Sequence, residues 1–183
     1  MTTKRNIWRI ALMIIAIGTA GVASAQNVHL KPPKANPTFT DKGLTLNAVG
    51  ALAGLGGGDV VITLTATANP TSSCTNPAGA TQPPGQNPAP VTVTGSEAIP
   101  ENEIKNGTVS FTVTTEAPVS PIPGAPDCPN PKWTEAITDM AFTSAVITVE
   151  QPAGTLVLTV SCSFTTQTTN GAVPVSNVSC VKS

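Results

Sequence analysis

Alternation of apolar and polar residues marks several segments of this chain as β-strands. In residues 60–67 the even-numbered positions are Val, Ile, Leu and Ala, whereas the odd-numbered ones are Val and three Thr. Residues 156–164 carry an apolar residue or a cysteine at every second position. A period of two is typical of a strand that has one face on a core and the other in solvent. Both segments therefore predict core strands.

Weaker alternation continues along the chain between segments rich in Pro, Gly and Asn. Residues 137–149 form the longest strand-like run, which we interpret as one strand or as two strands broken near Asp139. Residues 69–90 and 117–131 are dense in proline and predict two long loops. Further short strands are predicted at 44–48, 91–94, 108–115 and 173–181.

After residue 25, no segment has the apolar i, i+3, i+4, i+7 spacing of an amphipathic helix. About seven or eight strands separated by turn signals predict an immunoglobulin-like antiparallel β-sandwich. A small β-barrel would satisfy the same pattern and is the alternative fold.

The first residues predict export. Three cationic residues precede an almost wholly apolar run at 10–22, and Ala23-Ser24-Ala25 follows it. The run is shorter than the roughly 20 residues that span a bilayer, and small residues in this order are typical of a signal-peptidase site. We predict cleavage before Gln26, no stable membrane insertion afterwards, and a secreted or cell-surface protein, or a periplasmic one in a Gram-negative host.

The chain after the signal peptide is predicted to have two parts. Residues 26–42 are polar and contain prolines without a sustained period, which predicts a flexible leader on which Phe39 could dock against the domain. Residues 43–183 are predicted to form a single β-sandwich domain.

The charge of the exported chain excludes several partners. After residue 25 it holds 6 Lys, no Arg and 10 Asp or Glu, so its formal charge is 6 − 10 = −4. Nucleic-acid binding requires cations that neutralise phosphates, and a basic membrane-surface patch requires the same residues. We therefore predict that the protein binds no nucleic acid.

The tetrapeptide Cys-x-Asn-Pro occurs twice, at residues 74–77 and 128–131, each time in a proline-rich loop. All 4 cysteines lie in the exported part, and an even number in an oxidising compartment predicts two disulfides with three possible pairings. We prefer Cys74–Cys128, which joins the two repeated motifs, and Cys162–Cys180, which joins two C-terminal strands. The absence of a C-x-x-C pair disfavours a zinc site or a redox-active bridge.

Catalytic chemistry is scarce in this sequence. The single histidine, His29, lies in the predicted leader, where it cannot serve a nucleophile with the required precision. Pairs of carboxylates could cleave a polysaccharide, but the exported chain has only one Trp, four Phe and no Tyr to line a sugar groove. We predict no catalytic residue. The acids considered for such a hydrolase are Asp127, Glu135 and Asp139, or Glu97, Glu101 and Glu103.

Three residues near the repeated motifs are candidate ligand contacts: Trp133, Asn76 and Asn130. For Trp133 the main alternative is packing over a disulfide at the end of the sandwich. Calcium would require oxygen ligands, and the least unsuitable acids are Asp127, Glu135 and Asp59, but no run resembles D-x-D-x-D-G. We predict no metal site and no cofactor.

Several motifs together resemble those of a family of short secreted bacterial β-rich proteins with paired Cys-x-Asn-Pro motifs and no assigned activity. The resemblance covers about residues 44–164 and implies no catalytic or binding residue. It is carried by residues 74–79, 84–88, 105–107, 128–133 and 142–145.

These observations predict a secreted, non-enzymatic β-sandwich with a binding or structural role at or beyond the cell surface. An extracellular protein or a glycan is the expected partner, and the sequence leaves the oligomeric state open. A polymerising surface-fibre or pilus-type subunit is the first alternative, because low charge suits strand-to-strand association. A carboxylate-based polysaccharide hydrolase is the second.

Overall fold

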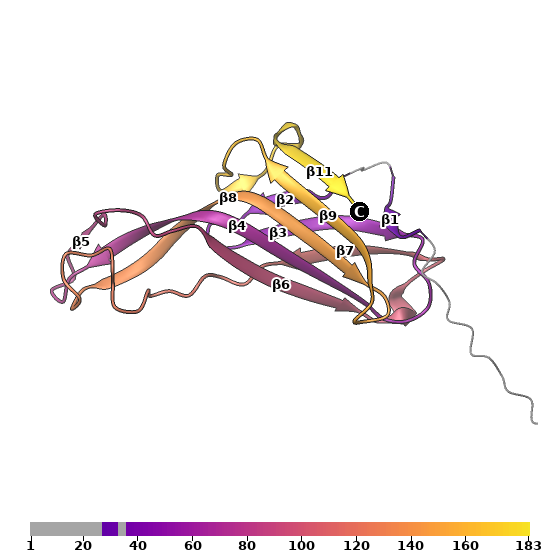
Figure 1. The fold of residues 1–183 in the computed structure, drawn as a ribbon, viewed down its shortest axis with the longest axis horizontal. Helices are drawn as coiled ribbons and strands as arrows, with labels where there is room; N and C mark the ends of the chain where they lie inside the picture. The colour runs from indigo at the N-terminus through magenta and orange to yellow at the C-terminus, as the bar shows by residue number, and fades with distance from the viewer. Residues whose placement is uncertain (1–26, 33–35) are drawn as a thin grey trace, which may run out of the picture.

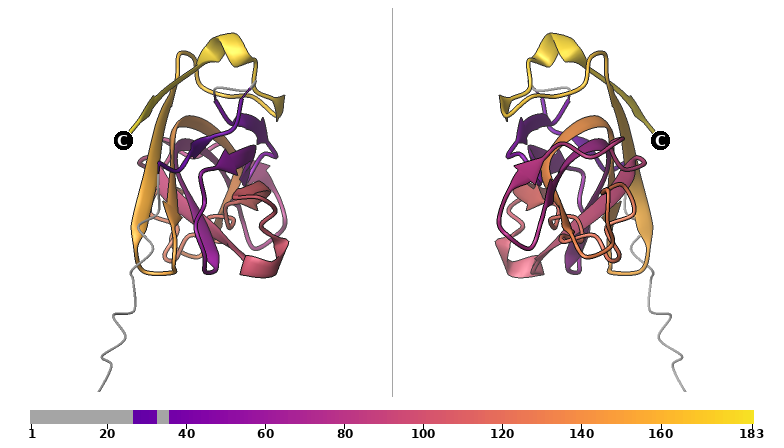
Figure 2. Two further views of the ribbon diagram at one scale, coloured as in Figure 1. Left: turned by 90° about the vertical axis from the view of Figure 1, so that its right-hand side faces the viewer. Right: turned by 90° about the vertical axis from the view of Figure 1, so that its left-hand side faces the viewer.

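A computed structural model describes residues 27–32 and 36–183, which form two antiparallel β-sheets packed face to face (Figures 1 and 2). The predicted signal peptide, residues 1–25, lies outside the described residues. Within the described part there are eleven strands, seven of which have five residues or more. Two sheets that do not close into a barrel confirm the predicted antiparallel sandwich, and the small-barrel alternative is wrong. In the same residues no helix is long and apolar enough to cross a membrane.

Strand β3 is the centre of the first sheet. Strands β1 and β2 pair with successive parts of one edge of β3, β7 pairs with its other edge, and β10 extends the sheet beyond β2. The free edge of β7 lies against β6 of the second sheet, where the Glu97 carboxylate accepts a hydrogen bond from Thr112 N at 2.9 Å. The bounds are β1 (His29–Leu30), β2 (Thr38–Asp41), β3 (Leu46–Ala53), β7 (Thr108–Thr114) and β10 (Gly171–Ala172).

The second sheet is longer and has the order β11-β9-β8-β4. Two strands share the remaining edge of β4: β6 pairs with residues 60–68, and β5 pairs with residues 74–75. The bounds are β4 (Val60–Thr75), β5 (Thr81–Gln82), β6 (Val91–Ile99), β8 (Thr134–Glu150), β9 (Leu156–Phe164) and β11 (Val178–Lys182). Two three-residue 3-10 helices, η1 (Glu101–Glu103) and η2 (Val175–Asn177), lie in the connections.

The hydrophobic core lies between the two sheets. Every even-numbered residue of β4 is buried, as the alternation in the sequence predicts, and the core partners from the first sheet include Leu52 and Phe111. Phe39 of β2 and Phe164 of β9 meet edge to face with ring centroids 5.3 Å apart. This aromatic contact joins the two sheets near the C-terminal strands.

Residues 134–150 form one strand, β8, without a break at Asp139. Two β-bulges interrupt its register with β4, and each leaves one threonine of β8 without an opposite residue. The hydroxyls of these residues, Thr138 and Thr143, each donate to a carbonyl of β4 at 3.2 Å, to Thr71 O and Thr67 O respectively. Because each bulge shifts the side-chain phase by one residue, the alternation in this segment looks broken in the sequence.

The prediction of a flexible leader over residues 26–42 is wrong for the described part. Residues 29–30 and 38–41 are strands paired with β3, and Val28, Leu30 and Phe39 are buried. Strands of two and four residues are too short for a period to be visible in the sequence. Their pairing comes from the edge that β3 offers, and the domain therefore begins before residue 43. His29 is exposed on β1.

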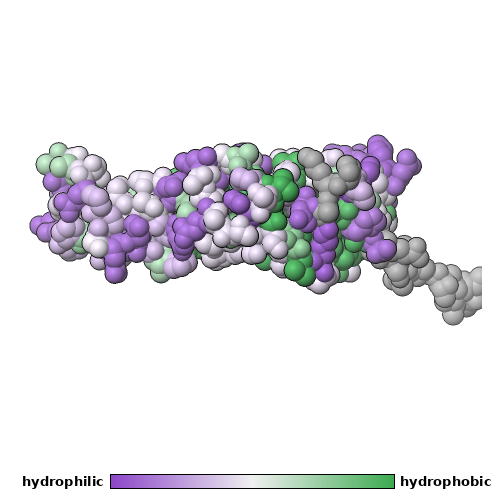
Figure 3. All heavy atoms as spheres, turned by 90° about the horizontal axis from the view of Figure 1, so that it is seen from above, coloured by the Kyte–Doolittle hydropathy of each residue, from purple (hydrophilic) through white to green (hydrophobic). Residues whose placement is uncertain are grey.

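A second correction concerns residues 69–75, which were predicted as loop and belong to β4. Pro70 suggests a turn, but here it lies within a strand. Together with residues 134–141 of β8, this segment extends beyond the first sheet as a two-stranded ribbon, and gives the molecule its elongated shape (Figures 1 and 3). We call this ribbon, with β5 and the loops 76–90 and 115–133, the distal arm.

Candidate functional site

The distal arm buries a small interior of its own. Ser72 and Cys74 of β4 and Glu135 of β8 are at most 4% exposed, and none belongs to the hydrophobic core of the sandwich. The loop 115–133 covers this face in place of a second sheet. Its backbone is attached to β8 by a hydrogen bond from Ile122 N to Glu135 O at 2.8 Å.

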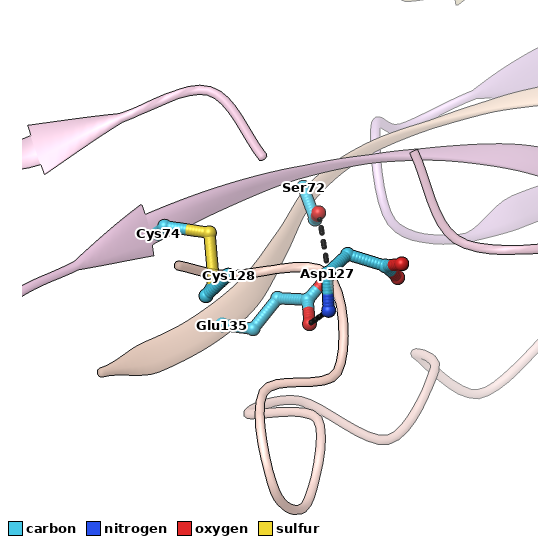
Figure 4. Close-up of a disulfide and its surroundings, with 5 residues drawn as sticks. All are labelled: Ser72, Cys74, Asp127, Cys128 and Glu135. Atoms are coloured by element: carbon cyan, nitrogen blue, oxygen red, sulfur yellow. Dashed lines mark hydrogen bonds between the residues drawn. A yellow bond between two sulfur atoms is a disulfide. The ribbon is translucent and has the colours of Figure 1, made fainter. Parts of the chain in front are cut away.

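Glu135 is the centre of this interior (Figure 4). Its side chain is fully buried, Oε1 accepts a hydrogen bond from Ser72 Oγ at 2.9 Å, and Oε2 accepts one from Asp127 N at 3.3 Å. A buried carboxyl group is tolerated only where such donors satisfy its oxygens. Glu135 therefore links the loop 115–133 to the ribbon through its side chain.

A disulfide lies directly beside this carboxyl group (Figure 4). Cys74 is opposite Glu135 in the β4–β8 register, and it is bonded to Cys128 of the loop 115–133. The other bridge joins Cys162 and Cys180, which are opposite each other on β9 and β11. Both predicted pairings are confirmed, and the described residues contain no free cysteine.

The two Cys-x-Asn-Pro motifs adopt the same turn. In each, the asparagine Oδ1 accepts a hydrogen bond at 2.9 Å from the N–H two residues later. The donor is Ala78 N for Asn76 and Lys132 N for Asn130. In each, the asparagine carbonyl also accepts the N–H three residues later. Proline after asparagine fixes the φ that this turn requires. The repeat is thus a structural unit placed after each cysteine of one bridge.

Trp133 follows the second of these turns. Its N–H donates to Asn130 O at 2.9 Å, and its side chain is half-buried rather than part of the hydrophobic core. Contact of Trp133, Asn76 or Asn130 with a ligand stays a prediction.

Asp127 connects the two loops of the arm to each other. Its Oδ1 accepts a hydrogen bond from Gln86 Nε2 at 3.0 Å, and its carbonyl accepts one from Gly85 N at 3.1 Å. Since its own N–H donates to Glu135, the loop 76–90 rests on the loop 115–133, which rests on the ribbon. The arm is a connected set of polar contacts around one covalent bridge.

An open groove of about 600 Å³ lies between β4 and the loop 76–90. Residues 71–73 of β4 form one wall and residues 81–87 form the other. The lining consists of Thr, Ser, Gln, Asn, Pro and Gly, and it includes no charged and no aromatic residue. The candidate contacts Trp133, Asn76 and Asn130 do not line this groove.

The carboxylates considered for catalysis do not form one cluster, although Asp127 is a neighbour of the buried Glu135. Glu135 is enclosed in the arm, Asp139 lies near Gly43, and Glu97 caps the edge of β7. Asp59, a calcium candidate, binds Glu101 N in the loop before β4, at the opposite end of that strand from Cys74. Within residues 27–32 and 36–183, no group of three or more His, Cys, Asp or Glu residues could hold a metal ion.

A second polar cluster lies where the arm joins the sandwich. Asp41 is 3% exposed, its Oδ1 accepts a hydrogen bond from Gly43 N at 2.9 Å, and its Oδ2 accepts one from the Thr168 hydroxyl. Burial and the negative charge of Asp139 raise the pKa of Asp41, against the opposing effect of these two hydrogen bonds. Asp139 Oδ1 is itself buried and has no hydrogen-bond partner in the described residues.

Sequence reasoning named the two bridges but missed the interior of the arm and the groove. The available signal was the phase of β4: its buried even-numbered positions continue without a shift through Ser72 to Cys74. This continuation was not predicted because Pro70 indicated a loop. The burial of Glu135 depends on the irregular loop 115–133 that precedes β8, and no periodic pattern in the sequence predicts how that loop folds back.

No family model matches this chain, and no curated protein or solved structure is significantly similar to it. The resemblance to secreted proteins with paired Cys-x-Asn-Pro motifs stays a prediction, and function must be argued from the geometry of the arm.

Proposed function

We propose that the protein is an exported, non-enzymatic β-sandwich that binds an extracellular protein or glycan through its distal arm. The observation that carries this proposal is the construction of the arm. It projects beyond the sandwich, its loops are held by a disulfide and a buried carboxyl group, and its groove is open to solvent. Loops fixed in advance lose less conformational freedom when they bind.

Export is supported by the two bridges and by the predicted signal peptide. Disulfides persist in oxidising compartments and are rare in the reducing cytosol. The bridges join segments that are 54 and 18 residues apart, and both lie in the part that remains after the predicted cleavage. A secreted, cell-surface or periplasmic location fits them equally.

The absence of catalysis is supported by what the acidic side chains do. Glu135, Asp127 and Glu97 each accept hydrogen bonds that hold parts of the fold together. A general acid or base must instead reach a substrate. Assembly into a fibre finds support in the edge strand β11, where Val181 is 72% exposed, and is the second candidate function.

The test uses the mature, oxidised chain from residue 26, labelled with a fluorophore, and cell-envelope material from the producing organism. We expect saturable binding that is lost when Gln82 and Asn87 in the groove are both changed to Ala. The matched control is Val181→Ser on β11, which should bind as the wild type does. Circular dichroism verifies the fold of each variant.

Two results would contradict this proposal: binding that survives the change in the groove, or binding that is lost in the β11 variant instead. The second result, together with sedimentation that shows growing oligomers as concentration rises, would favour a fibre subunit.

A further inference from the structure

The groove lies along a stretch of β4 that has no strand partner on one edge. Pairing with β6 ends at Ala68, and pairing with β5 begins at Cys74. Pro83 and Pro84 follow β5 directly and end its ladder, because proline has no N–H to donate. The loop then departs from β4, so residues 69–73 have no strand partner on this edge, and residues 71–73 line the groove.

The backbone groups on this edge can be assigned from the hydrogen bonds of β4. Thr67 O and Thr71 O accept from β8, so odd-numbered residues direct their backbone groups toward β8. Asn76 N donates to Ala80 O on the β5 side, so even-numbered residues face the other edge. The unpaired edge therefore carries Pro70 C=O, Ser72 N–H and Ser72 C=O, and the two groups of Ser72 belong to the groove.

This set does not suit an added peptide strand. A strand that joins an edge needs alternating donors and acceptors, and specificity then comes from pockets for its side chains. Pro70 removes one of the two donors that the five-residue gap could supply, and the lining has no charged residue and, apart from Pro83 and Pro84, no apolar side chain. The edge is in this respect protected against strand addition.

The side chains of the groove suit a different ligand. Thr71, Thr81 and the amides of Gln82 and Asn87 are exposed and can both donate and accept hydrogen bonds. A neutral sugar presents hydroxyl groups that do the same, without a fixed alternation. An anionic or cationic ligand would find no opposite charge in the lining.

We propose that this groove binds neutral hexose units of an extracellular glycan. The inference rests on the proposed function and specifies its ligand. Since no aromatic ring is present for a sugar to stack on, binding relies on hydrogen bonds that compete with water. We therefore expect a dissociation constant in the millimolar range for one site.

The test is a titration of the ¹⁵N-labelled mature protein, followed by NMR, with cellohexaose, maltohexaose, mannohexaose and laminarihexaose. At least one of them should shift the amide signals of residues 71–73, 81–82 and 85–87 in a saturable way. Gln82→Ala and Asn87→Ala should each weaken that binding several-fold. Gln167→Ala, an exposed glutamine outside the groove, is the matched control and should leave it unchanged.

The inference is overturned if none of the four sugars shifts these signals, or if the shifts map outside the groove. It is also overturned if the anionic polymer polygalacturonate or an unstructured polar peptide binds there as tightly. Binding of the arm to envelope material without any sugar response would leave the proposed function standing and remove this inference alone.

Discussion

The sandwich and the distal arm share two long strands but are stabilised in different ways. Between the sheets, β4 and β8 bury Ile, Leu, Val, Ala and Phe against the first sheet. Beyond that sheet the same strands bury a serine, a cysteine and a glutamate under an irregular loop, and of their apolar residues Ile137 and Met140 still belong to the core. The sandwich is stabilised mainly by buried apolar area, whereas the arm adds hydrogen bonds and one covalent bridge to a much smaller apolar contribution.

The comparison teaches what a strand needs once its facing sheet ends. A two-stranded ribbon is at best marginally stable in water, because it has no opposite layer on which to bury apolar side chains. A proline-rich loop supplies few such side chains, and its backbone groups need partners. Glu135 supplies an acceptor for one of them, and the Cys74–Cys128 bridge keeps the loop in place.

The largest effect is expected in the sandwich. Phe111 is 2% exposed, and its ring covers Gly50, where an added Cβ would lie 2.5 Å from Cζ. Phe111→Ala leaves a cavity and should lower the free energy of unfolding by about 3–5 kcal/mol. Urea denaturation of the oxidised protein measures the loss. Val181→Ala, exposed on β11, is the control and should change it by at most about 0.5 kcal/mol. A loss of stability smaller than that caused by changing Cys74 and Cys128 or Glu135 in the arm would contradict this ranking of the two regions.

The next effect concerns the bridge of the arm. Cys74→Ala with Cys128→Ala removes a link between residues 54 apart and should lower stability by about 2–4 kcal/mol. Hydrogen exchange should accelerate first in the loop 115–133, while β3 and β9 stay protected. The double variant of Cys162 and Cys180 is the control, since it should release β11 and not the arm. Equal acceleration across both sheets would show that the arm has no stability of its own.

Glu135 should have a smaller and more local effect. Glu135→Ala leaves the Ser72 hydroxyl and Asp127 N without their acceptor, which costs about 1–3 kcal/mol. Glu135→Gln keeps one acceptor oxygen and should lose less. Exchange of the Asp127 amide, measured by NMR, reports the loosening of the loop. If Gln and Ala are equally damaging, the charge of the carboxylate rather than its acceptors matters most.

The fold followed from the sequence where the alternation is long and regular. Strands β4 and β9 show it, and the two bridges followed from the repeated motif and the even cysteine count. The extent of β8 did not follow, because the bulges at Thr138 and Thr143 reverse the side-chain phase twice within 17 residues. Nor did β1, β2 and β10, which exist because neighbouring strands offer them an edge.

The candidate site could be predicted from the sequence less well than the fold. Asn76 and Asn130 stood out as a repeat, but their Oδ1 atoms close local turns. The groove depends on where the loop 76–90 leaves β4, and that is decided by Pro83 and Pro84 together with contacts to Asp127. Such contacts link segments about 40 residues apart, so a local pattern does not contain them.

The smallest expected effect lies at the junction of the two regions, and it depends on pH. Burial first, and the charge of Asp139 second, raise the pKa of Asp41 in the folded state. The folded protein thus holds this proton more tightly than the unfolded chain, whose Asp pKa is about 3.9. The resulting stability is fully present below that value and is lost as pH rises through the folded-state pKa.

At neutral pH the wild type keeps a buried, ionised Asp41 in the fold, which lowers its free energy of unfolding, and protonation removes this destabilisation. Asp41→Asn should therefore remove it at every pH. Asparagine keeps an oxygen for Gly43 N and places an amide beside the Thr168 hydroxyl, so the shape of the junction is retained. The measurement is the urea midpoint of both proteins between pH 7 and pH 4. The urea midpoint of the wild type should rise relative to that of the variant as pH falls. Asp139→Asn should reduce the same pH dependence by removing the like charge. A difference in midpoint that does not change with pH would show that the contact between arm and sandwich at Asp41 is electrostatically neutral.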